Sequence, residues 1–502
     1  ATIYSRAIVG VDAPQVKIEV HISNGLPSFQ IVGLPDTGVR ESRDRVRSAI
    51  INSQFEFPQS RLTVNLSPAD IPKEGARYDL AIAIGILAAS KQLSSKNLNQ
   101  YEFIGELGLN GELRVTKANI PAALAIRKAN RIATFPLAVK AEISVISALK
   151  AIAAPNLLSV FQHLMATALL PYIAYSAPAH QSDNDDLVCF SDVLGQEQAK
   201  RVLEIAAAGQ HNLIMMGAPG TGKSMLAQRM LTILPEMNET EAIETAAIHS
   251  IIGKSITPTN WKTRPFRSPH HTVSGIALVG GGSIPKPGEI SLAQNGVLFL
   301  DELPEFGRKV LDVLREPMET GKVTISRAAH QADFPASFQL IAALNPSPTG
   351  HYNDGRCQPD KVLQYLNKIS GPILDRIDLQ IEVANIKASE LTQYNVGETS
   401  ETIKNRVVGA RQLMLNRAGK PNGLLTSKEL QLACPLSSQL QSFLQHRLEA
   451  LQISVRAFHK ILKVARTIAD LANCKHIEQQ HIAEALSYRA MDRLLHYLTK
   501  QV

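Results

Sequence analysis

Cysteine is scarce in this chain, with four residues among 502. The four lie far apart and no two form a Cys-x-x-Cys pair, so a disulfide framework or a zinc finger is not expected. Cysteine usage of this kind is typical of a reducing compartment.

Long hydrophobic runs are also missing. The longest, at residues 80–89, is well short of the roughly 18 residues that a membrane helix needs. The first ten residues, ATIYSRAIVG, lack the charged-then-apolar plan of a secretory signal peptide. Internal repeats and low-complexity tracts are absent too, which excludes repeat architectures. These features predict a cytoplasmic protein with no membrane partner.

The charge balance is basic, with 52 lysines and arginines, 45 aspartates and glutamates and a formal net charge of +7. Such a balance is compatible with binding to a polyanion, although many basic proteins bind no nucleic acid. Hydrophobic residues make up 45% of the chain and charged residues 19%, as in a globular protein. At this length we expect roughly two to four domains, because one core rarely serves so many residues.

The distribution of hydrophobic residues predicts an α/β protein of three blocks and one linker. We expect an N-terminal block at residues 1–169, a linker at 170–188, a second block at 189–387 and a helical C-terminal block at 388–502. In the linker the periodicity disappears and small polar residues take over. In the second block strands alternate with helical patterns, which predicts a parallel sheet covered by helices.

Local periodicity places elements within these blocks. Strands are expected at residues 16–22, 29–32 and 62–66, and helices at residues 40–53, 79–89, 121–128, 455–472 and 477–488. The mixture predicts an α/β fold for the N-terminal block.

The most informative segment, residues 217–224, reads GAPGTGKS. It matches the G-x-x-x-x-G-K-S phosphate-binding loop, follows a strand-like run at residues 212–216 and precedes a helix predicted at residues 225–231. Glycines let backbone N–H groups point at phosphate oxygens, and the helix N-terminus adds positive charge. The residues predicted to bind ATP are Gly217, Ala218, Pro219, Gly220, Thr221, Gly222, Lys223 and Ser224.

A second motif pairs with this loop. Asp301 and Glu302 end an apolar run at residues 296–300, and parallel sheets bind ligands at the carboxyl edge of their strands. Lys223 would then contact the β- and γ-phosphates, while Ser224 and Asp301 hold Mg²⁺, the aspartate through water. Glu302 would take the proton of the attacking water. Each motif alone also fits a Gly-rich turn or an ordinary strand end, but together they predict ATP hydrolysis.

Three further polar residues are candidates for the same reaction. Asn345 ends a strand-like run at residues 338–344, where it would orient the lytic water; a turn asparagine before Pro346 is the simpler explanation. Arg376 could reach a neighbour's γ-phosphate, or form a local surface pair with an aspartate. Arg456 could contact the phosphates of its own subunit's nucleotide, or merely solvate a helix.

The order Lys223, Asp301–Glu302, Asn345, Arg376, Arg456 is that of an AAA+ ATPase, and the chain resembles the magnesium-chelatase-like AAA+ proteins of the YifB/ComM family. The likeness covers nearly the whole chain except the linker. The stretches that carry it are FSDVLGQEQAK (190–200), RPFRSPHH (264–271), REPME (315–319), SGPILDR (370–376), VARTIADL (464–471), IVGLPD (31–36), ESRDRVR (41–47) and NLSPADIPKEG (65–75).

The resemblance implies roles for these residues. Asn345 would be sensor 1, Arg376 an arginine finger acting in trans, and Arg456 sensor 2, in a C-terminal helical lid. The segment 190–200 would line the adenine side. An arginine finger implies a ring, expected to be a homo-hexamer. Some relatives carry several cysteines after sensor 1, but this chain has only Cys357 nearby, so no metal cluster is expected there.

The N-terminal block looks like the Lon-protease fold. Residues 72–76 (PKEGA) match the stretch before the nucleophilic serine of that protease, but Arg77 follows, and Ala122 aligns with its lysine. Without a hydroxyl nucleophile and its base there is no acyl chemistry, so we expect a protease fold without protease activity.

By the same resemblance, two insertions would face the pore of the ring: a loop at residues 263–289, which also carries Arg264, and a hairpin at residues 322–334. The side chains expected to contact DNA there are Arg267, His270, His271, Lys286, Lys322 and Arg327. Basic groups on loops hold phosphates without reading bases, but they also simply solvate loops. The arginines of residues 40–47 are expected to form a solvated helix face.

The function implied by the resemblance is an ATP-driven ring motor. It would move three- or four-stranded DNA junctions during integration of imported DNA by homologous recombination in natural transformation. The expected cofactors are ATP and Mg²⁺; the expected partners are DNA, further copies of the chain and recombination proteins. The alternatives are a chelatase-type remodeller of a protein partner, a scaffold with an inactive ATPase and a proteolytic machine.

Overall fold

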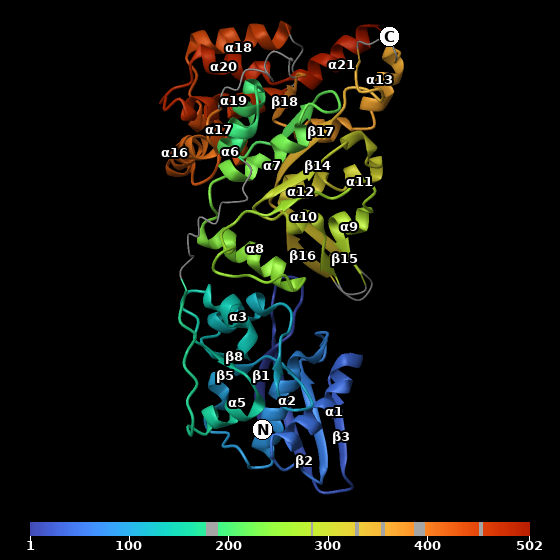
Figure 1. Cartoon of the computed structure of the whole chain (residues 1–502), viewed down its shortest axis with the longest axis vertical. Coiled ribbons are helices and arrows are strands. Elements are labelled where there is room, and N and C mark those ends of the chain that lie inside the picture. Colours follow the sequence, from blue (N-terminus) through green and yellow to red (C-terminus); the bar gives the residue numbers. More distant parts are fainter. Residues whose placement is uncertain are drawn as a thin grey trace.

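The computed structural model describes residues 1–176, 189–282, 285–326, 331–352, 357–385, 397–450 and 455–501 (Figure 1). The chain is elongated, with the N-terminal block at one end and the C-terminal helices at the other (Figure 1). Among the described residues, no helix is both long and apolar enough to cross a bilayer.

The N-terminal block is built on two small sheets. The first has the order β1-β2-β4-β3, antiparallel except for the β3–β4 pair, and the second, β5-β8-β9, is parallel. Their strands are β1 (Thr2–Arg6), β2 (Gln15–Ser23), β3 (Ser28–Val32), β4 (Arg61–Ser67), β5 (Tyr101–Phe103), β8 (Ile132–Pro136) and β9 (Ala151–Ala154), besides the hairpin of β6 (Glu106–Leu107) and β7 (Leu113–Arg114).

Helices pack against these sheets: α1 (Thr37–Asn52), α2 (Asp79–Ala89), α3 (Asn119–Lys128), α4 (Lys140–Ser144) and α5 (Leu157–Leu164). The predicted strands and helices of this block are confirmed, with shifted ends. Helix α1 begins before the predicted residue 40 because the Asp36 side chain caps it, accepting from the Val39 N–H at 2.7 Å. After Asp79, helix α2 is apolar on all sides, and it is buried from Asp79 to Leu87.

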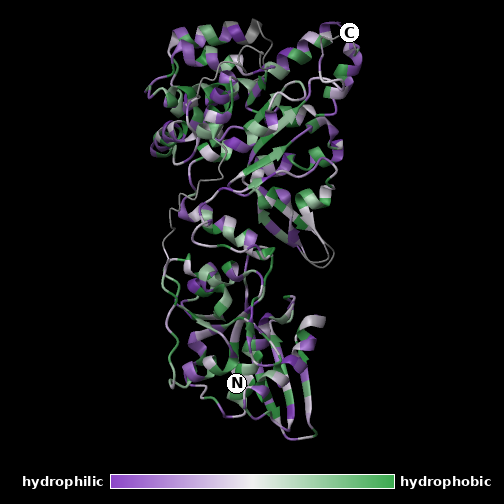
Figure 2. Ribbon diagram, viewed as in Figure 1, coloured by the Kyte–Doolittle hydropathy of each residue, from purple (hydrophilic) through white to green (hydrophobic). Residues whose placement is uncertain are grey.

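The second block holds a five-stranded parallel sheet in the order β11-β14-β17-β10-β18, which confirms the predicted parallel sheet. Its strands are β11 (Phe266–Arg267), β14 (Val297–Leu300), β17 (Gln339–Leu344), β10 (Leu213–Met216) and β18 (Leu379–Glu382). Alternate residues of a strand face opposite sides, so each central strand contributes to two hydrophobic cores. Figure 2 shows the central strands as mostly hydrophobic and the surrounding helices as mixed.

The helices and shorter strands of this block surround the sheet. They are α6 (Glu197–Gly209), α7 (Lys223–Ile233), α8 (Glu239–Ile251), α9 (Gly275–Val279), β12 (Gly280–Gly281), β13 (Lys286–Pro287), α10 (Glu289–Leu292), α11 (Arg308–Asp312), α12 (Arg315–Thr320), β15 (Lys322–Ser326), β16 (Gln331–Pro335), α13 (Pro359–Leu366) and α14 (Gly371–Leu374). Short 3-10 helices are η1 (Ala76–Tyr78), η2 (Leu98–Gln100), η3 (Leu137–Val139), η4 (Phe190–Asp192), η5 (Leu303–Glu305) and η6 (Asn422–Leu424).

Two segments of this block are the predicted insertions. The hairpin is confirmed as β15 and β16, which pair antiparallel from Lys322 with Pro335 to Ser326 with Gln331. The segment at residues 263–289 is not a simple loop, since it contains β11, α9 and the β12–β13 pair. Ser274 starts α9 because its hydroxyl accepts from the Ala277 N–H at 3.2 Å.

The N-terminal block contacts two parts of the second block, α8 and the β15–β16 hairpin. Helix α8 docks on it through Ser250, whose carbonyl accepts from the Ala118 N–H at 2.8 Å and whose hydroxyl donates to Glu142 at 2.6 Å. On the other side, the turn between β1 and β2 approaches the hairpin: a Cβ atom at Gly10 would stand 3.2 Å from the Asp333 carbonyl oxygen. The hairpin lies on the side of its block that faces the N-terminal block (Figure 1).

The C-terminal block is helical in its described residues. Its helices are α16 (Ser400–Ala418), α17 (Ser427–Ala433), α18 (Ser438–Ala450), α19 (Val455–Leu471), α20 (Gln479–Ser487) and α21 (Ala490–Gln501). The helices predicted at residues 455–472 and 477–488 are confirmed as α19 and α20. The apolar stripe of α19, which includes Ile461, Ala465 and Ile468, packs in the same core as α6 and α7.

Candidate nucleotide-hydrolysis site

The residues 217–222 connect β10 to α7 as a tight loop. Gly220 and Gly222 have φ angles of 81° and 86°, a region that residues with a Cβ atom rarely adopt. A Cβ atom at Gly217 would come within 2.7 Å of the Val383 carbonyl oxygen. The glycines are therefore required by the turn and by the close approach of two backbones.

Lys223 begins α7 and points back into this loop. Its ammonium donates to the carbonyls of Gly217 at 2.8 Å and Ala218 at 2.9 Å, and to Asn345 Oδ1 at 3.2 Å. Burial lowers the pKa of Lys223, while the negative charges of Asp301 and Glu302 oppose that shift. The structure thus brings Asn345 and the loop lysine together.

Ser224 and Asp301 also meet. The Ser224 hydroxyl donates to Asp301 Oδ2 at 2.5 Å, because Asp301 follows β14 at the carboxyl edge of the sheet, where α7 begins. A hydroxyl and a carboxylate side by side form an oxygen donor set of the kind that Mg²⁺ prefers. These two residues fit the predicted metal site, and the loop fits the phosphates of a nucleotide.

Glu302 lies in the left-handed region with a φ of 52°, and its N–H donates to Asp301 Oδ1 at 2.9 Å. Its carboxylate lies 3.3 Å from His271 Nδ1. Glu302 and His271 line a cavity of about 760 Å³ together with Asn345. His271, predicted from sequence to contact DNA, is therefore placed against Glu302, at the edge of the sheet that holds the loop.

Several residues of this cavity were missed by the sequence reasoning: Glu305, Lys361, Gln364, Tyr365 and Lys368. Burial, with the charges of Glu305 and Glu302, raises the pKa of Tyr365 to about 12. Lys361, Gln364 and Tyr365 belong to α13, and no local motif marks that helix. Glu305 is the one of these five residues that the sequence could have indicated, because it lies three residues after Glu302.

The segment 190–200 reaches the loop from the other side. Gln196 Nε2 donates to the Ala384 carbonyl at 2.6 Å and lies 3.5 Å from the Thr221 carbonyl oxygen. A second cavity of about 330 Å³ lies beside Gly217 and Ala218 and is also lined by Tyr352 and Val383. Ala384, whose carbonyl accepts from Gln196, also lines this cavity.

Arg376 lies at the opposite edge of the sheet from the loop. Its carbonyl accepts from the side chain of Asn212, which directly precedes β10, whereas the loop follows β10. At about 3.3 Å per residue, Asn212 and Gly217 are about 16 Å apart along the strand. The Arg376 guanidinium is paired with Glu319 and donates to the Pro372 carbonyl. The structure does not bring Arg376 to the loop of its own chain.

Arg456 lies near Arg376 and is not brought to the loop either. Its guanidinium is 3.6 Å from the Asp375 carboxylate, with exposed side-chain fractions of 72% and 50% for the two residues. The predicted contact with phosphates bound by the same chain has no support in this geometry.

The remaining residues predicted to contact DNA fall into different environments. Arg267 is held by Glu289 through two contacts of 2.6 and 2.7 Å. The His270 ring lies 4.1 Å from the His271 ring, and its Nδ1 bonds Thr272. Lys286 and Lys322 are exposed. Arg327 lies outside the residues that the structure describes.

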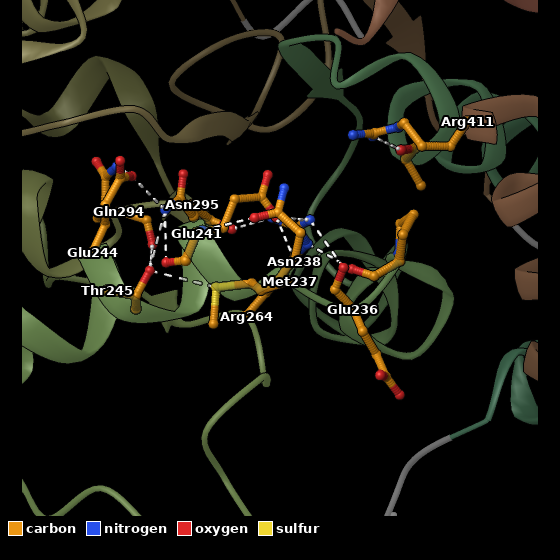
Figure 3. Close-up of polar contacts among 12 residues, drawn as sticks. Glu236, Met237, Asn238, Glu241, Glu244, Thr245, Arg264, Gln294, Asn295 and Arg411 are labelled. Carbon is orange, nitrogen blue, oxygen red and sulfur yellow. Dashed lines mark hydrogen bonds and ion pairs between the residues drawn. The ribbon is translucent and has the colours of Figure 1, made fainter. Parts of the chain in front are cut away.

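Arg264 is buried and forms the centre of a polar network (Figure 3). It donates to the carbonyls of Pro235 and Asn295, each at 2.6 Å, and to the Glu241 carboxylate at 2.9 Å. Asn295 in turn donates to the Glu241 carbonyl. This network ties α8 to the start of β14, so Arg264 holds the fold together and is not available to DNA.

In the N-terminal block, Arg77 and Ala122 are both buried, in η1 and α3 respectively. Arg77 Nη1 lies 3.4 Å from the Lys117 carbonyl oxygen, just before α3. Neither side chain offers a hydroxyl or an amine for nucleophilic attack.

A family model described as magnesium chelatase, subunit ChlI, matches residues 189–391. Models described as subunit ChlI of Mg-chelatase and its C-terminal part match residues 18–137 and 397–489.

Three relatives align with this chain over nearly its whole length. Competence protein ComM of Haemophilus influenzae is 52% identical over 504 residues, with 99% of each chain covered. YifB of Salmonella typhimurium is 50% identical, covering 100% of this chain and 99% of its own. YifB of Escherichia coli is 49% identical, covering 99% and 98%. The chain therefore belongs to the YifB/ComM family of magnesium-chelatase-like AAA ATPases.

Proposed function

We propose that the chain is an ATP-driven ring motor that moves three- or four-stranded DNA junctions while imported DNA is integrated by homologous recombination. The observation that carries this proposal is the meeting of Lys223, Ser224, Asp301, Glu302 and Asn345 at one edge of the sheet. The printed name of the Haemophilus relative, a competence protein, supports the link to DNA uptake.

In the proposed reaction the loop would hold ATP, and Lys223 would exchange its carbonyl partners for phosphate oxygens. Ser224 and Asp301 would hold Mg²⁺, which would offset negative charge on the phosphates. Glu302 would take the proton of the attacking water, and Asn345 would orient that water.

The position of Arg376 supports a ring. It lies about one strand length from its own loop, so we assign it to the loop of a neighbouring copy. Arg456 stands at the same edge, so we assign it to the neighbour's site as well. A closed ring of identical copies, a hexamer, gives every loop such a neighbour.

DNA contacts are assigned to the exposed lysines of the inserted strands, Lys286 and Lys322. Arg267 is left out, since Glu289 neutralises it. The N-terminal block is proposed to be a Lon-type fold without protease activity. Arg77 and Ala122 stand at the positions where that protease would have its nucleophilic serine and its lysine.

The test is ATP-dependent branch migration on a labelled three-stranded junction, with the intact protein compared with Lys223→Ala and Glu302→Gln. Conversion by the intact protein and by neither variant is expected. The match to magnesium-chelatase models favours one rival, a remodeller of a protein partner. Basal ATPase activity with neither conversion nor stimulation by DNA would select that rival.

A further inference from the structure

The arginine proposed to serve the neighbouring copy is held in place within its own chain. The Arg376 guanidinium pairs through Nη2 with the Glu319 carboxylate and donates from Nη1 to the Pro372 carbonyl. Its side chain is only 16% exposed, whereas that of Glu319 is 60% exposed. A guanidinium has five N–H donors in a rigid plane, so two anchored nitrogens fix its orientation and leave other donors free.

Glu319 belongs to an element that leads directly into the hairpin. It lies on α12, which ends at Thr320; Gly321 follows, and Lys322 then begins β15. The Gly321 carbonyl accepts from the Ala336 N–H at 2.8 Å, just after β16 ends. Met318 of α12 packs in the same core as Val323 and Phe334 of the hairpin. The helix and the hairpin therefore form one packed unit.

From this arrangement we infer that Glu319 is a positioning residue that ties the orientation of Arg376 to the β15–β16 hairpin. A displacement of the hairpin moves α12, and with it the carboxylate that aims the guanidinium at the neighbouring copy. A polyanion bound at the hairpin of one copy thus changes the rate of ATP hydrolysis in the next. This inference rests on the proposed ATPase function and adds the residue that couples the two sites.

The first experiment is a double-mutant cycle on the full-length protein with Glu319→Gln, Arg376→Ala and the double variant. Glu319→Gln should lower kcat for ATP about tenfold with little change in KM, since it removes a charge-assisted contact that acts in the transition state. In the Arg376→Ala background the same change should have no further effect. Glu316→Gln, exposed on the same helix, is the matched control and should behave as the intact protein.

An equal loss of kcat in both backgrounds would assign Glu319 a merely structural role and overturn the inference. An unchanged kcat in Glu319→Gln would overturn it too.

The second experiment mixes two inactive variants. Glu302→Gln copies cannot hydrolyse ATP but supply Arg376, and Arg376→Ala copies keep an intact loop, so mixed rings should recover activity. We call the copy that supplies Arg376 the donor. The recovered activity should fall about tenfold when the donor carries Glu319→Gln in addition to Glu302→Gln. Donors that are equally effective with and without Glu319 would refute the coupling through Arg376.

The same mixtures, measured with and without a single-stranded oligonucleotide, separate this inference from the proposed function. Stimulation should be seen with Glu302→Gln donors and be lost with the double-variant donors. If the oligonucleotide stimulates neither the mixtures nor the intact protein, and the intact protein converts no junction, the DNA motor is refuted. The basal rates of the mixtures then still decide whether Glu319 positions Arg376.

Discussion

Individual side chains at the carboxyl edge of the sheet set the chemistry of the site. Lys223 and Asn345 share a hydrogen bond, Ser224 donates to Asp301, and Glu302 opens onto the large cavity. Glu302 differs from Asp301 in that its carboxylate is half exposed and has His271 as its neighbour. The two adjacent carboxylates thus have different environments, in keeping with the different roles proposed for them.

Replacing Glu302 by Gln should lower kcat for ATP at least about 100-fold, because the amide cannot accept the proton of the attacking water. ATP binding should persist, since the loop and Lys223 are intact. Steady-state hydrolysis and calorimetric titration with ATP measure the two quantities. Glu305→Gln, in the same cavity, is the control. A variant that hydrolyses ATP normally would remove Glu302 from its assigned role.

Lys322 offers a test of the DNA contact. Its exposed ammonium should neutralise one phosphate, so Lys322→Ala should reduce the slope of log affinity against log salt concentration by about 1. Titration of a fluorescent oligonucleotide at several salt concentrations measures the slope. The exposed Lys428→Ala in α17 is the control and should leave the slope unchanged. Equal slopes for all three proteins would place the DNA elsewhere.

At the scale of elements, the strands, helices and loop were predictable because their signals are local. Adjacent residues are enough to identify the apolar runs of β10 and β14. They are also enough to identify the loop at residues 217–222, which follows β10. The pairs Arg376–Glu319, Arg267–Glu289 and His271–Glu302 were not predictable, since each joins residues far apart in sequence or brought together by a turn. Arg264 illustrates the same limit, because its burial depends on three distant segments.

The cap of α1 is testable at this scale. Asp36 accepts from the N–H groups of Val39 at 2.7 Å and Gly75 at 3.1 Å. Asp36→Ala should lower the free energy of unfolding of this block by about 1 to 2 kcal/mol, because both donors lose their partner. Urea denaturation measures the change. Asp44→Ala, exposed on the same helix, should change it little, and an equal loss in both would exclude the cap as the cause.

At the scale of the whole molecule, a buried polar contact joins the N-terminal block to α8. Glu142 accepts from the Ser250 hydroxyl at 2.6 Å and from the Asn119 amide at 3.3 Å. Burial raises the pKa of Glu142 above its ordinary value of 4.5, and these hydrogen bonds oppose the shift only in part. The folded protein therefore holds this proton more tightly than the unfolded chain does.

The raised pKa of Glu142 makes the stability of the folded protein depend on pH. A raised carboxyl pKa gives stability that is present at low pH and lost as the pH rises above the unfolded value. Glu142→Gln, which cannot ionise, should therefore gain in Tm relative to the intact protein over a pH range that begins at the ordinary carboxyl pKa of 4.5 and extends upward. Thermal unfolding across this range measures the difference. Glu112→Gln, exposed in the same block, should run parallel to the intact protein. A pH-independent gap between Glu142→Gln and the intact protein would contradict this origin.

The close approach of Gly10 to the Asp333 carbonyl has a mechanical consequence. Because Gly10 has no side chain, the turn lies close to the hairpin: a Cβ atom at position 10 would stand 3.2 Å from the Asp333 carbonyl oxygen and 3.3 Å from the Ala332 Cβ atom. We therefore expect the turn to resist any movement of the hairpin toward the N-terminal block. A larger residue at position 10 should force the turn and the hairpin apart, because its side chain would meet the Asp333 carbonyl oxygen and the Ala332 Cβ atom.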